Sequence, residues 1–367
     1  MDYKDKKSLL RINSARFYSY GWITEYLKNF SACEILKKTP LEISFETGIS
    51  FQKAESFLKK AASFDAEKEM EKAEKYGFSV FFYGEKNYPD CFYQIPQPPM
   101  AVYLKGVFSS FAAVAVVGTR KADAYAVKQT ESISFSLAQS GMGIISGLAR
   151  GVDTLAHKAA LKAKGKTAAV IGSGLSNIYP AENKKLAEEI CSCGGFILSE
   201  SPLEEEPLKQ NFPLRNRLIS ALSWGVLVIR GDYPSGSLIT ARHALTQGKE
   251  VMAVPGNIDN PLSNGPNKLI KEGAVPIISW TDVLDAAPEY IRRELIVIKS
   301  KKNKKAGEEL EEQLKKIFYF ISLNEGITCD EISCGLSMPV SQVLTSVFEL
   351  ESGGFVASKG GRYYCIK

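Results

Sequence analysis

The sequence predicts an α/β protein whose extended Rossmann-like, doubly wound sheet follows a helical N-terminal domain and precedes a C-terminal winged helix. Three observations predict this fold class. Helical apolar spacing occupies residues 1–75, short apolar strands alternate with helices up to residue 288, and three helices with two strands follow over residues 308–367. With 367 residues the chain has room for two or three domains, because single cores stop growing at about 250 to 300 residues.

The first region, residues 1–75, is expected to be a bundle of short helices. Apolar residues recur there at three- and four-residue spacing, and Gly21 and Gly48 mark turns. The predicted helices span residues 9–26, 32–37, 41–47 and 52–63. A bundle of this size is typical of a helix–hairpin–helix-like domain.

Residues 76–110 are expected to form a connecting arm that lies on the neighbouring domain. An aromatic-rich strand is predicted over residues 78–83. The run YPDCFYQIPQPP follows it, and this run must be extended or turning because proline fixes φ and disfavours helix before it.

The Rossmann-like region extends from residue 111 to residue 288, so that with its arm the domain covers residues 76–288. Predicted strands span residues 113–117, 142–145, 167–171, 195–199, 226–229, 251–254 and 274–278. Predicted helices span residues 124–139, 153–164, 183–191, 215–222, 238–247 and 267–272. This alternation predicts a parallel sheet covered on both faces, whose ligands bind at the carboxyl ends of the strands.

A lysine-rich linker is predicted over residues 289–307, and a winged helix over residues 308–367. Its helices are expected at residues 308–323, 329–336 and 339–351, with a wing around Gly360-Gly361. A third helix that reads a DNA groove needs basic or amide side chains, but this one holds Glu349, Glu351 and no Lys or Arg. For this module we therefore favour contact with protein, or a bracing role in a dimer, over DNA binding.

Composition points to a cytoplasmic protein and permits a nucleic-acid partner. The net charge is +5, and the longest apolar stretches have only strand length, so no membrane segment is expected. Seven scattered cysteines fit reduced thiols, and with only two histidines there is little material for a metal site. Residues 1–7 are charged without a following apolar segment, so no secretory signal is expected.

The predicted strands end in turns rich in glycine, serine, threonine and arginine. In chain order these turns contain Gly118-Thr119-Arg120, SGLARG (146–151), Gly172-Ser173-Gly174, FPLRNRLISALS (212–223), SGSLIT (235–240) and Pro255-Gly256. Any one of them could be an ordinary tight turn. Because the fold brings six strand ends to one rim, their N–H groups, hydroxyls and guanidinium groups predict an anion-binding rim.

Motifs of other nucleotide and hydrolytic sites are absent. Gly172-Ser173-Gly174 lacks the third glycine of the dinucleotide fingerprint, and the sequence contains no P-loop and no G-x-S-x-G elbow. Asp153 and His157 share a helix face, and we favour a capping carboxylate and a core histidine that brace the loop over acid–base catalysis. We predict no catalytic residue, no metal and no cofactor.

Seven segments carry a family resemblance: VVGTRKADAYA, GIISGLARGVDTLAHKAAL, GKTAAVIGSGLSNIYPAEN, ILSESP, FPLRNRLISALS, SGSLITARHAL and VMAVPGNIDNPLSNGPNKLIKEGA. In this order, after the lead-in YPDCFYQIPQPPMAVYLKG, they resemble the DNA-processing protein A family, also called DprA or Smf. The resemblance covers residues 76–285. It implies an extended Rossmann fold, often with a sterile-alpha-motif-like (SAM-like) domain before it and a winged helix after it.

The function implied by the resemblance is that of a recombination mediator. Such proteins bind and protect incoming single-stranded DNA in natural transformation and help to load the RecA recombinase. The family usually dimerises through the Rossmann domain, and neither a nucleotide cofactor nor turnover is implied.

The resemblance also implies the residues of a phosphate-binding pocket. By their places in the motifs they are Gly118, Thr119, Arg120, Ser146, Gly147, Arg150, Lys209, Arg215, Asn216, Arg217, Ser235, Gly236, Ser237 and Thr240. The rim is expected to be led by Arg120, Arg217 and the 235–240 turn. Phe212 and Tyr179 are candidates for stacking bases, with core packing as the alternative.

Two departures and two rival functions remain open. Ala181 occupies a position where the family often has a lysine, and Lys184 or Lys185 could take over the role of that lysine. Arg230-Gly231 occupies a position where Glu-Ala is common in the family, and Arg230 could add a phosphate contact. One rival is a phosphoribohydrolase resembling "lysine decarboxylase" proteins, whose P-G-G-x-G-T run is missing after Pro255-Gly256. The other is a regulatory protein that binds a small phosphorylated ligand in the same pocket.

Overall fold

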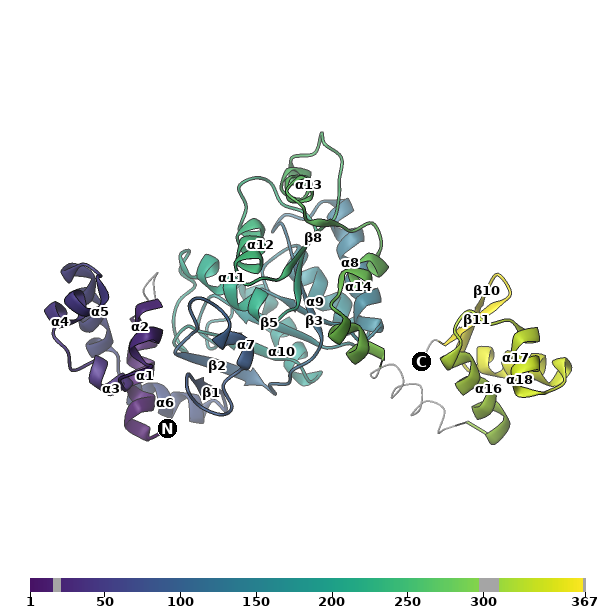
Figure 1. Ribbon diagram of the computed structural model, residues 1–367, viewed down its shortest axis with the longest axis horizontal. Coiled ribbons are helices and arrows are strands. Elements are labelled where there is room, and N and C mark those ends of the chain that lie inside the picture. The colour runs from purple at the N-terminus through teal and green to yellow at the C-terminus, as the bar shows by residue number, and fades with distance from the viewer. Residues whose placement is uncertain (16–20, 297–309, 366–367) are drawn as a thin grey trace. The chain divides into compact units, whose positions relative to one another are not determined.

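The chain divides into two compact units, Met1–Pro288 and Glu289–Lys367 (Figure 1). The computed structural model describes residues 1–15, 21–296 and 310–365.

Within the described residues, six helices open the first unit. They are α1 (Tyr3–Ser14), α2 (Gly21–Tyr26), α3 (Ala32–Ile35), α4 (Pro40–Thr47), α5 (Phe51–Ser63) and α6 (Ala66–Lys75). The single helix predicted over residues 9–26 is wrong, because α1 begins at Tyr3 and ends at Ser14, and residues 16–20 lie outside the described residues. Helix α6 has no counterpart among the predicted helices, since AEKEMEKAEK holds few apolar residues.

A nine-stranded sheet forms the centre of this unit. Its strands are β1 (Ser79–Phe82), β2 (Ala101–Gly106), β3 (Ala113–Val117), β4 (Gly143–Ser146), β5 (Thr167–Ile171), β6 (Phe196–Ser199), β7 (Gly225–Val228), β8 (Glu250–Ala253) and β9 (Val275–Pro276). They lie in the order β1-β2-β6-β5-β4-β3-β7-β8-β9. From β6 to β9 all neighbours are parallel, and every residue of β3 to β7 is buried, as in a sheet covered on both faces.

Helices α8 (Ala124–Gln139), α9 (Val152–Lys162), α10 (Lys184–Ser192), α11 (Asn211–Ala221), α12 (Gly236–Thr246) and α13 (Asn264–Lys271) connect the parallel strands. From β3 the chain steps through β4 and β5 to β6, returns to β7 beside β3, and then steps the other way. Helices α8 to α10 pack on one another, and α11 packs on α12, as right-handed crossovers on opposite faces require. The predicted doubly wound fold is confirmed, and its switch point lies between β3 and β7.

The arm joins the sheet as two antiparallel strands. Strand β1 pairs with β2, and β2 pairs with β6, where Tyr103 lies opposite Ser199. The proline-rich run between them contains a one-turn helix, α7 (Asp90–Tyr93), which directly follows Pro89. A proline is tolerated at a helix start because the first N–H groups have no partner within the helix. A further helix that the sequence pattern did not indicate, α14 (Trp280–Ala286), packs on α8.

The N-terminal helices pack on the sheet through a shared hydrophobic core. Leu9 of α1 and Tyr103 of β2 belong to the same cluster of buried residues. The side chain of Asn13 bridges the two parts, because its amide donates to the carbonyl of Glu200 at 2.8 Å and its oxygen accepts from the N–H of Ala101 at 3.2 Å. These contacts hold the end of α1 beside β2 and the loop after β6.

The second unit has its own core and the element order expected of a winged helix. It contains α16 (Glu312–Leu323), α17 (Cys329–Leu336), α18 (Val340–Ser352), β10 (Val356–Lys359) and β11 (Arg362–Cys365). Phe318 and Leu350 lie in its core. Of the predicted linker, residues 289–296 are helical, and residues 297–307 lie outside the described residues.

Candidate functional site

A cavity of about 680 Å³ opens at the switch point of the sheet. Its walls come from the segment after β3, the loop after β7, and the N-terminal turns of α11 and α12. The predicted site residues that line it are Gly118, Thr119, Arg120, Lys209, Arg215, Asn216, Ser235, Gly236, Ser237 and Thr240. A volume of this size accommodates a small ligand or a segment of a larger one.

The N-terminus of α12 borders the cavity. Ser235, Gly236 and Ser237 line it, and the hydroxyls of the two serines lie 2.9 Å apart. The first N–H groups of a helix have no partner within the helix and carry partial positive charge. A Cβ at Gly236 would meet no atom within 4 Å, so a ligand can approach this backbone closely. The turn therefore presents N–H groups and hydroxyls to an anion.

Cations and aromatic rings lie together in another part of the lining. The guanidinium of exposed Arg120 lies 5.3 Å from the centroid of the Phe212 ring. The rings of Phe212 and Tyr179 lie 5.8 Å apart with an interplanar angle of 57°. Lys209 is exposed and lines the same cavity. Such a group can bind a polyanion that also carries planar rings.

Arg215 belongs to a buried network that shapes the cavity wall. Its guanidinium donates to the carbonyl of Gly147 at 2.8 Å and to that of Val170. The Asp153 carboxylate accepts from the N–H of Gly147 at 3.1 Å and of Ala149 at 3.3 Å. Burial raises the pKa of Asp153 to about 6 and lowers the pKa of Arg215 to about 10, so both are ionised at neutral pH.

Glycine is required at position 147 by this network. A Cβ there would lie 2.7 Å from both the Asp153 carboxylate and the Arg215 guanidinium. The loop after β4 is thus held between the two charges, in the bracing role that the sequence suggested for Asp153.

Other predicted site residues lie outside the main cavity. Ser146 is buried, and its hydroxyl donates to the carbonyl of Val116 at 2.6 Å, which ties β4 to β3. Gly147 and Arg150 line a smaller adjoining cavity of about 30 Å³ that also touches Arg120. Both sides of the Arg150 fork bind Glu182, at 2.7 and 2.8 Å, so this guanidinium is already neutralised by a carboxylate.

Arg217 is buried away from the cavity, contrary to the expectation that it leads the rim. It is 5% exposed, and its guanidinium binds both carboxylate oxygens of Glu200, at 2.7 and 2.8 Å. It also donates to the carbonyl of Gln97 at 3.0 Å. The physical reason is the helical turn, because residues two apart on α11 point about 200° apart, and Arg215 takes the cavity side.

His157 is a core residue that contacts the start of β5. Its Nδ1 lies 2.7 Å from the Thr167 hydroxyl, which itself donates to the carbonyl of Ile144 at 2.8 Å. Since that hydroxyl has only one proton, Nδ1 is the donor. Burial lowers the pKa of His157 to about 3, so the ring is neutral at pH 7.

The loop after β7 differs from the expectation in two ways. Arg230 is buried, with its guanidinium 4.2 Å from the Tyr125 ring centroid and 3.7 Å from the Asp123 carboxylate, so the additional phosphate contact expected of it does not fit its position. Asp232 lines the cavity although no motif marked it, and Tyr233 stands exposed beside it. Sequence spacing gives no signal for these residues, because they depend on where an irregular loop runs.

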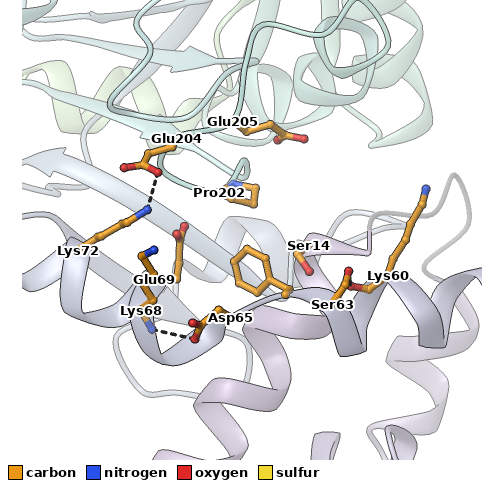
Figure 2. A pocket seen from close by; sticks show the side chains of 11 residues that line it. Ser14, Lys60, Ser63, Asp65, Lys68, Glu69, Lys72, Pro202, Glu204 and Glu205 are labelled. Atoms are coloured by element: carbon orange, nitrogen blue, oxygen red, sulfur yellow. Dashed lines mark hydrogen bonds and ion pairs between the residues drawn. The ribbon is translucent and has the colours of Figure 1, made fainter.

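A second cavity, of about 430 Å³, lies between α6 and the loop after β6. Figure 2 shows Lys72 pointing to Glu204, with which it forms an ion pair, and Lys68 beside Asp65. Glu69 also faces this space, and burial raises its pKa. Because carboxylates stand among the lysines, this cavity is a poor candidate for an anion site.

Two properties of the described residues bear on the class of site. Among residues 1–15, 21–296 and 310–365, no cluster of three or more His, Cys, Asp or Glu side chains could hold a metal ion. Within the same ranges no helix is both long and apolar enough to cross a membrane.

The family model and the relatives found by sequence point to the same family. Residues 79–288 match the family described as DNA recombination-mediator protein A. The chain is 42% identical over 216 residues to DNA processing protein DprA from Bacillus subtilis (strain 168), which covers 58% of this chain and 72% of that protein. It also resembles two solved structures of the same kind of protein.

The first of these is DNA processing protein A from Streptococcus pneumoniae, with a TM-score of 0.66 and 33% identity over 78% of this chain and 99% of that one. The second is DNA processing protein A from Helicobacter pylori, with a TM-score of 0.51 and 32% identity over 57% of this chain and 94% of that one. The Helicobacter pylori structure concerns a single-stranded DNA binding mode of that protein.

Proposed function

The chain belongs to the DNA recombination-mediator protein A family, and we propose that it binds single-stranded DNA in the cavity at the switch point. In this role the N-terminus of α12 receives one phosphate through its N–H groups and serine hydroxyls. Arg120 and Lys209 hold neighbouring phosphates, while Phe212 and Tyr179 offer faces to the bases.

One observation carries this proposal: a cation, two aromatic rings and a helix N-terminus line a single cavity. A site for a lone phosphate needs the helix N-terminus, but it has no use for paired rings beside a guanidinium. A single strand needs both, because its phosphates are charged and its unstacked bases have exposed faces.

In the cell we propose that this binding protects incoming single-stranded DNA in natural transformation and helps to load the RecA recombinase. The support for this part is membership of the family.

Family membership also supports our proposal of a cytoplasmic location, no catalytic turnover and no cofactor. We also propose a division into a SAM-like domain (1–75), a Rossmann-like domain (76–288), a linker (289–307) and a winged helix (308–367).

We further propose a homodimer formed through the Rossmann domain at the β9 edge of the sheet. Ile258 and Ile278 are 83% and 82% exposed. Ile258 follows β8, and Ile278 follows the edge strand β9. An open sheet edge with exposed apolar side chains is a surface that proteins usually cover.

Band-shift titration with single- and double-stranded oligonucleotides tests the DNA-binding proposal. Wild-type protein should prefer the single strand. The logarithm of its association constant should fall linearly with the logarithm of the salt concentration, with a slope of about 0.7 for each phosphate bound. Arg120→Ala should weaken binding about tenfold or more, since it removes both a phosphate contact and a partner of Phe212.

Arg11→Ala is the matched control, because Arg11 is an exposed arginine of the same unit that lies outside the lining of the cavity. If Arg120→Ala bound oligonucleotides as wild type does, the cavity would not be the DNA site. Hydrolysis of a nucleoside monophosphate by the purified protein would instead favour the enzyme alternative.

A further inference from the structure

Tyr233 occupies a second aromatic position beside the cavity. It stands between Asp232 and Ser235, which both line the cavity, and its side chain is 46% exposed. Tyr179 and Phe212 follow β5 and β6, whereas Tyr233 follows β7. In the sheet β4 and β3 separate β5 from β7, so the two aromatic positions arise from strands about 14 Å apart, on either side of the switch point.

Two basic side chains accompany Tyr233. The ammonium of Lys268, on α13, lies 3.6 Å from the centroid of the Tyr233 ring. Its ammonium and the Arg242 guanidinium, on α12, also contact the phenol, and they lower the pKa of Tyr233, with the hydrogen bond from Lys268 as the largest cause. Both are exposed, although Lys268 also has the Glu272 carboxylate at 3.9 Å.

The combination resembles the Arg120–Phe212 pair chemically: a partly exposed ring with a cation over it. A cation–π contact at an exposed site is worth only about 0.5 to 1 kcal/mol, which does not by itself account for a large ring left half open at a cavity mouth. Asp232 precedes Tyr233 in the chain and lines the cavity, and its carboxylate disfavours a phosphate at that point. A base is the part of a single strand that suits this place.

We propose that Tyr233 stacks a base of single-stranded DNA at the β7 side of the cavity, and that Arg242 and Lys268 bind the phosphate that follows. This inference rests on the proposed function, and it extends the DNA path from the central cavity over α12 and α13. The base takes the open face of the ring, and Lys268 remains over the other.

Oligonucleotide length separates this contact from the central one. A strand of about 2 nucleotides is too short to extend from Arg120 to Tyr233, whereas one of about 12, within the range of site sizes for single-strand binders, reaches both. Tyr233→Ala should weaken binding of the longer oligothymidylate about fivefold or more and leave the shorter one unchanged. Tyr233→Phe should restore the longer strand to wild-type affinity, because the ring and not the hydroxyl makes the contact.

Tyr76→Ala serves as the control, because Tyr76 is 47% exposed and lies outside the lining of the cavity. Wild-type affinity of Tyr233→Ala for the longer strand would overturn the inference while leaving the proposed function intact. An equal loss at both lengths would also overturn it, since the contact would then not be separate. If wild type bound neither strand, or Arg120→Ala had no effect, the proposed function itself would fail.

Salt dependence tests Lys268, one of the two basic residues. The slope of the log association constant against log salt concentration should become shallower by about 0.7 in Lys268→Gln for the longer strand, which corresponds to the loss of one phosphate contact. The slope for the shorter strand should stay unchanged. An unchanged slope for both strands would remove Lys268 from the DNA path. Thermal unfolding of each variant, compared with wild type, shows that it is folded under the binding conditions.

Discussion

Arg217 and Arg120 are both arginines of the predicted rim, but they have different surroundings. Arg120 is exposed beside Phe212, whereas the guanidinium of Arg217 lies in a bidentate pair with Glu200 that also reaches the carbonyl of Gln97. The pair connects α11 to the segment after β6 and to the arm. We therefore interpret Arg217 as a residue that stabilises the fold around the cavity.

Arg217→Ala should lower the free energy of unfolding by about 3 to 5 kcal/mol, because it leaves the Glu200 carboxylate buried and unpaired. Chemical denaturation measures this loss, and Arg150→Ala, which breaks an exposed ion pair, should cost far less. Oligonucleotide affinity per folded molecule should stay near wild type. A variant that is as stable as wild type but binds DNA poorly would show instead that Arg217 belongs to the DNA-binding residues.

His157 makes the stability of the fold depend on pH. Its folded pKa of about 3 lies below the unfolded value near 6.5, so the unfolded state binds more protons between these values and stability falls as the pH falls below 6.5. Asp153 acts in the opposite direction, because its folded pKa of about 6 lies above its unfolded value and favours folding at lower pH.

Comparison with His157→Gln isolates the histidine contribution. Between pH 7 and pH 5 wild type should lose about 2 kcal/mol of unfolding free energy relative to the variant. Urea denaturation of both proteins across this range measures the difference. Parallel stability curves would mean that the folded protein can protonate His157.

At the scale of elements, α12 is one of the helices whose N-terminal turn lines the cavity. Its N-terminal turn is open, because a Cβ at Gly236 would have no neighbour within 4 Å and Ser235 does not cap the helix with its side chain. Position 236 is also the first residue of the helix, where proline is tolerated since its missing N–H has no partner within the helix.

Gly236→Pro should thus remove one N–H group from the cavity and keep the helix. Ser235 already has φ −135° and ψ 160°, which a following proline accepts. We expect the melting temperature to stay unchanged or to rise slightly, and oligonucleotide affinity to fall about tenfold, the value of a hydrogen bond to a charged group. Unchanged affinity in a folded variant would contradict the role of this helix N-terminus.

At the scale of the whole molecule, the β9 edge bears on assembly. Ile278→Arg places a charge on the exposed apolar surface and should convert a dimer to monomers, as measured by sedimentation equilibrium. Leu41→Arg is the control, since Leu41 is also exposed but lies on α4, among the N-terminal helices that pack at the β1–β2 end of the sheet. A dimer that tolerates Ile278→Arg would place the interface elsewhere.

The parallel sheet, the order of its strands and helices, and the chemistry of the strand ends could all be predicted from the amino-acid sequence. These features follow from neighbouring residues: apolar periodicity sets each strand and helix, and glycine and serine set the turns. The residues Gly118 to Arg120 and Ser235 to Ser237 could therefore be named from their motifs, and the structure brings both turns to one cavity.

Which charged side chains reach that cavity depends instead on tertiary packing. Arg217 pairs with Glu200, Arg150 pairs with Glu182 and Arg230 turns inside, and in each case the partner is distant in sequence or lies in an irregular loop. The same is true of β2, whose antiparallel pairing with β6 joins residues far apart along the chain. A charged side chain is costly to bury unless a group of opposite charge or a hydrogen-bond acceptor pairs with it. Such partners come together only after distant segments have packed.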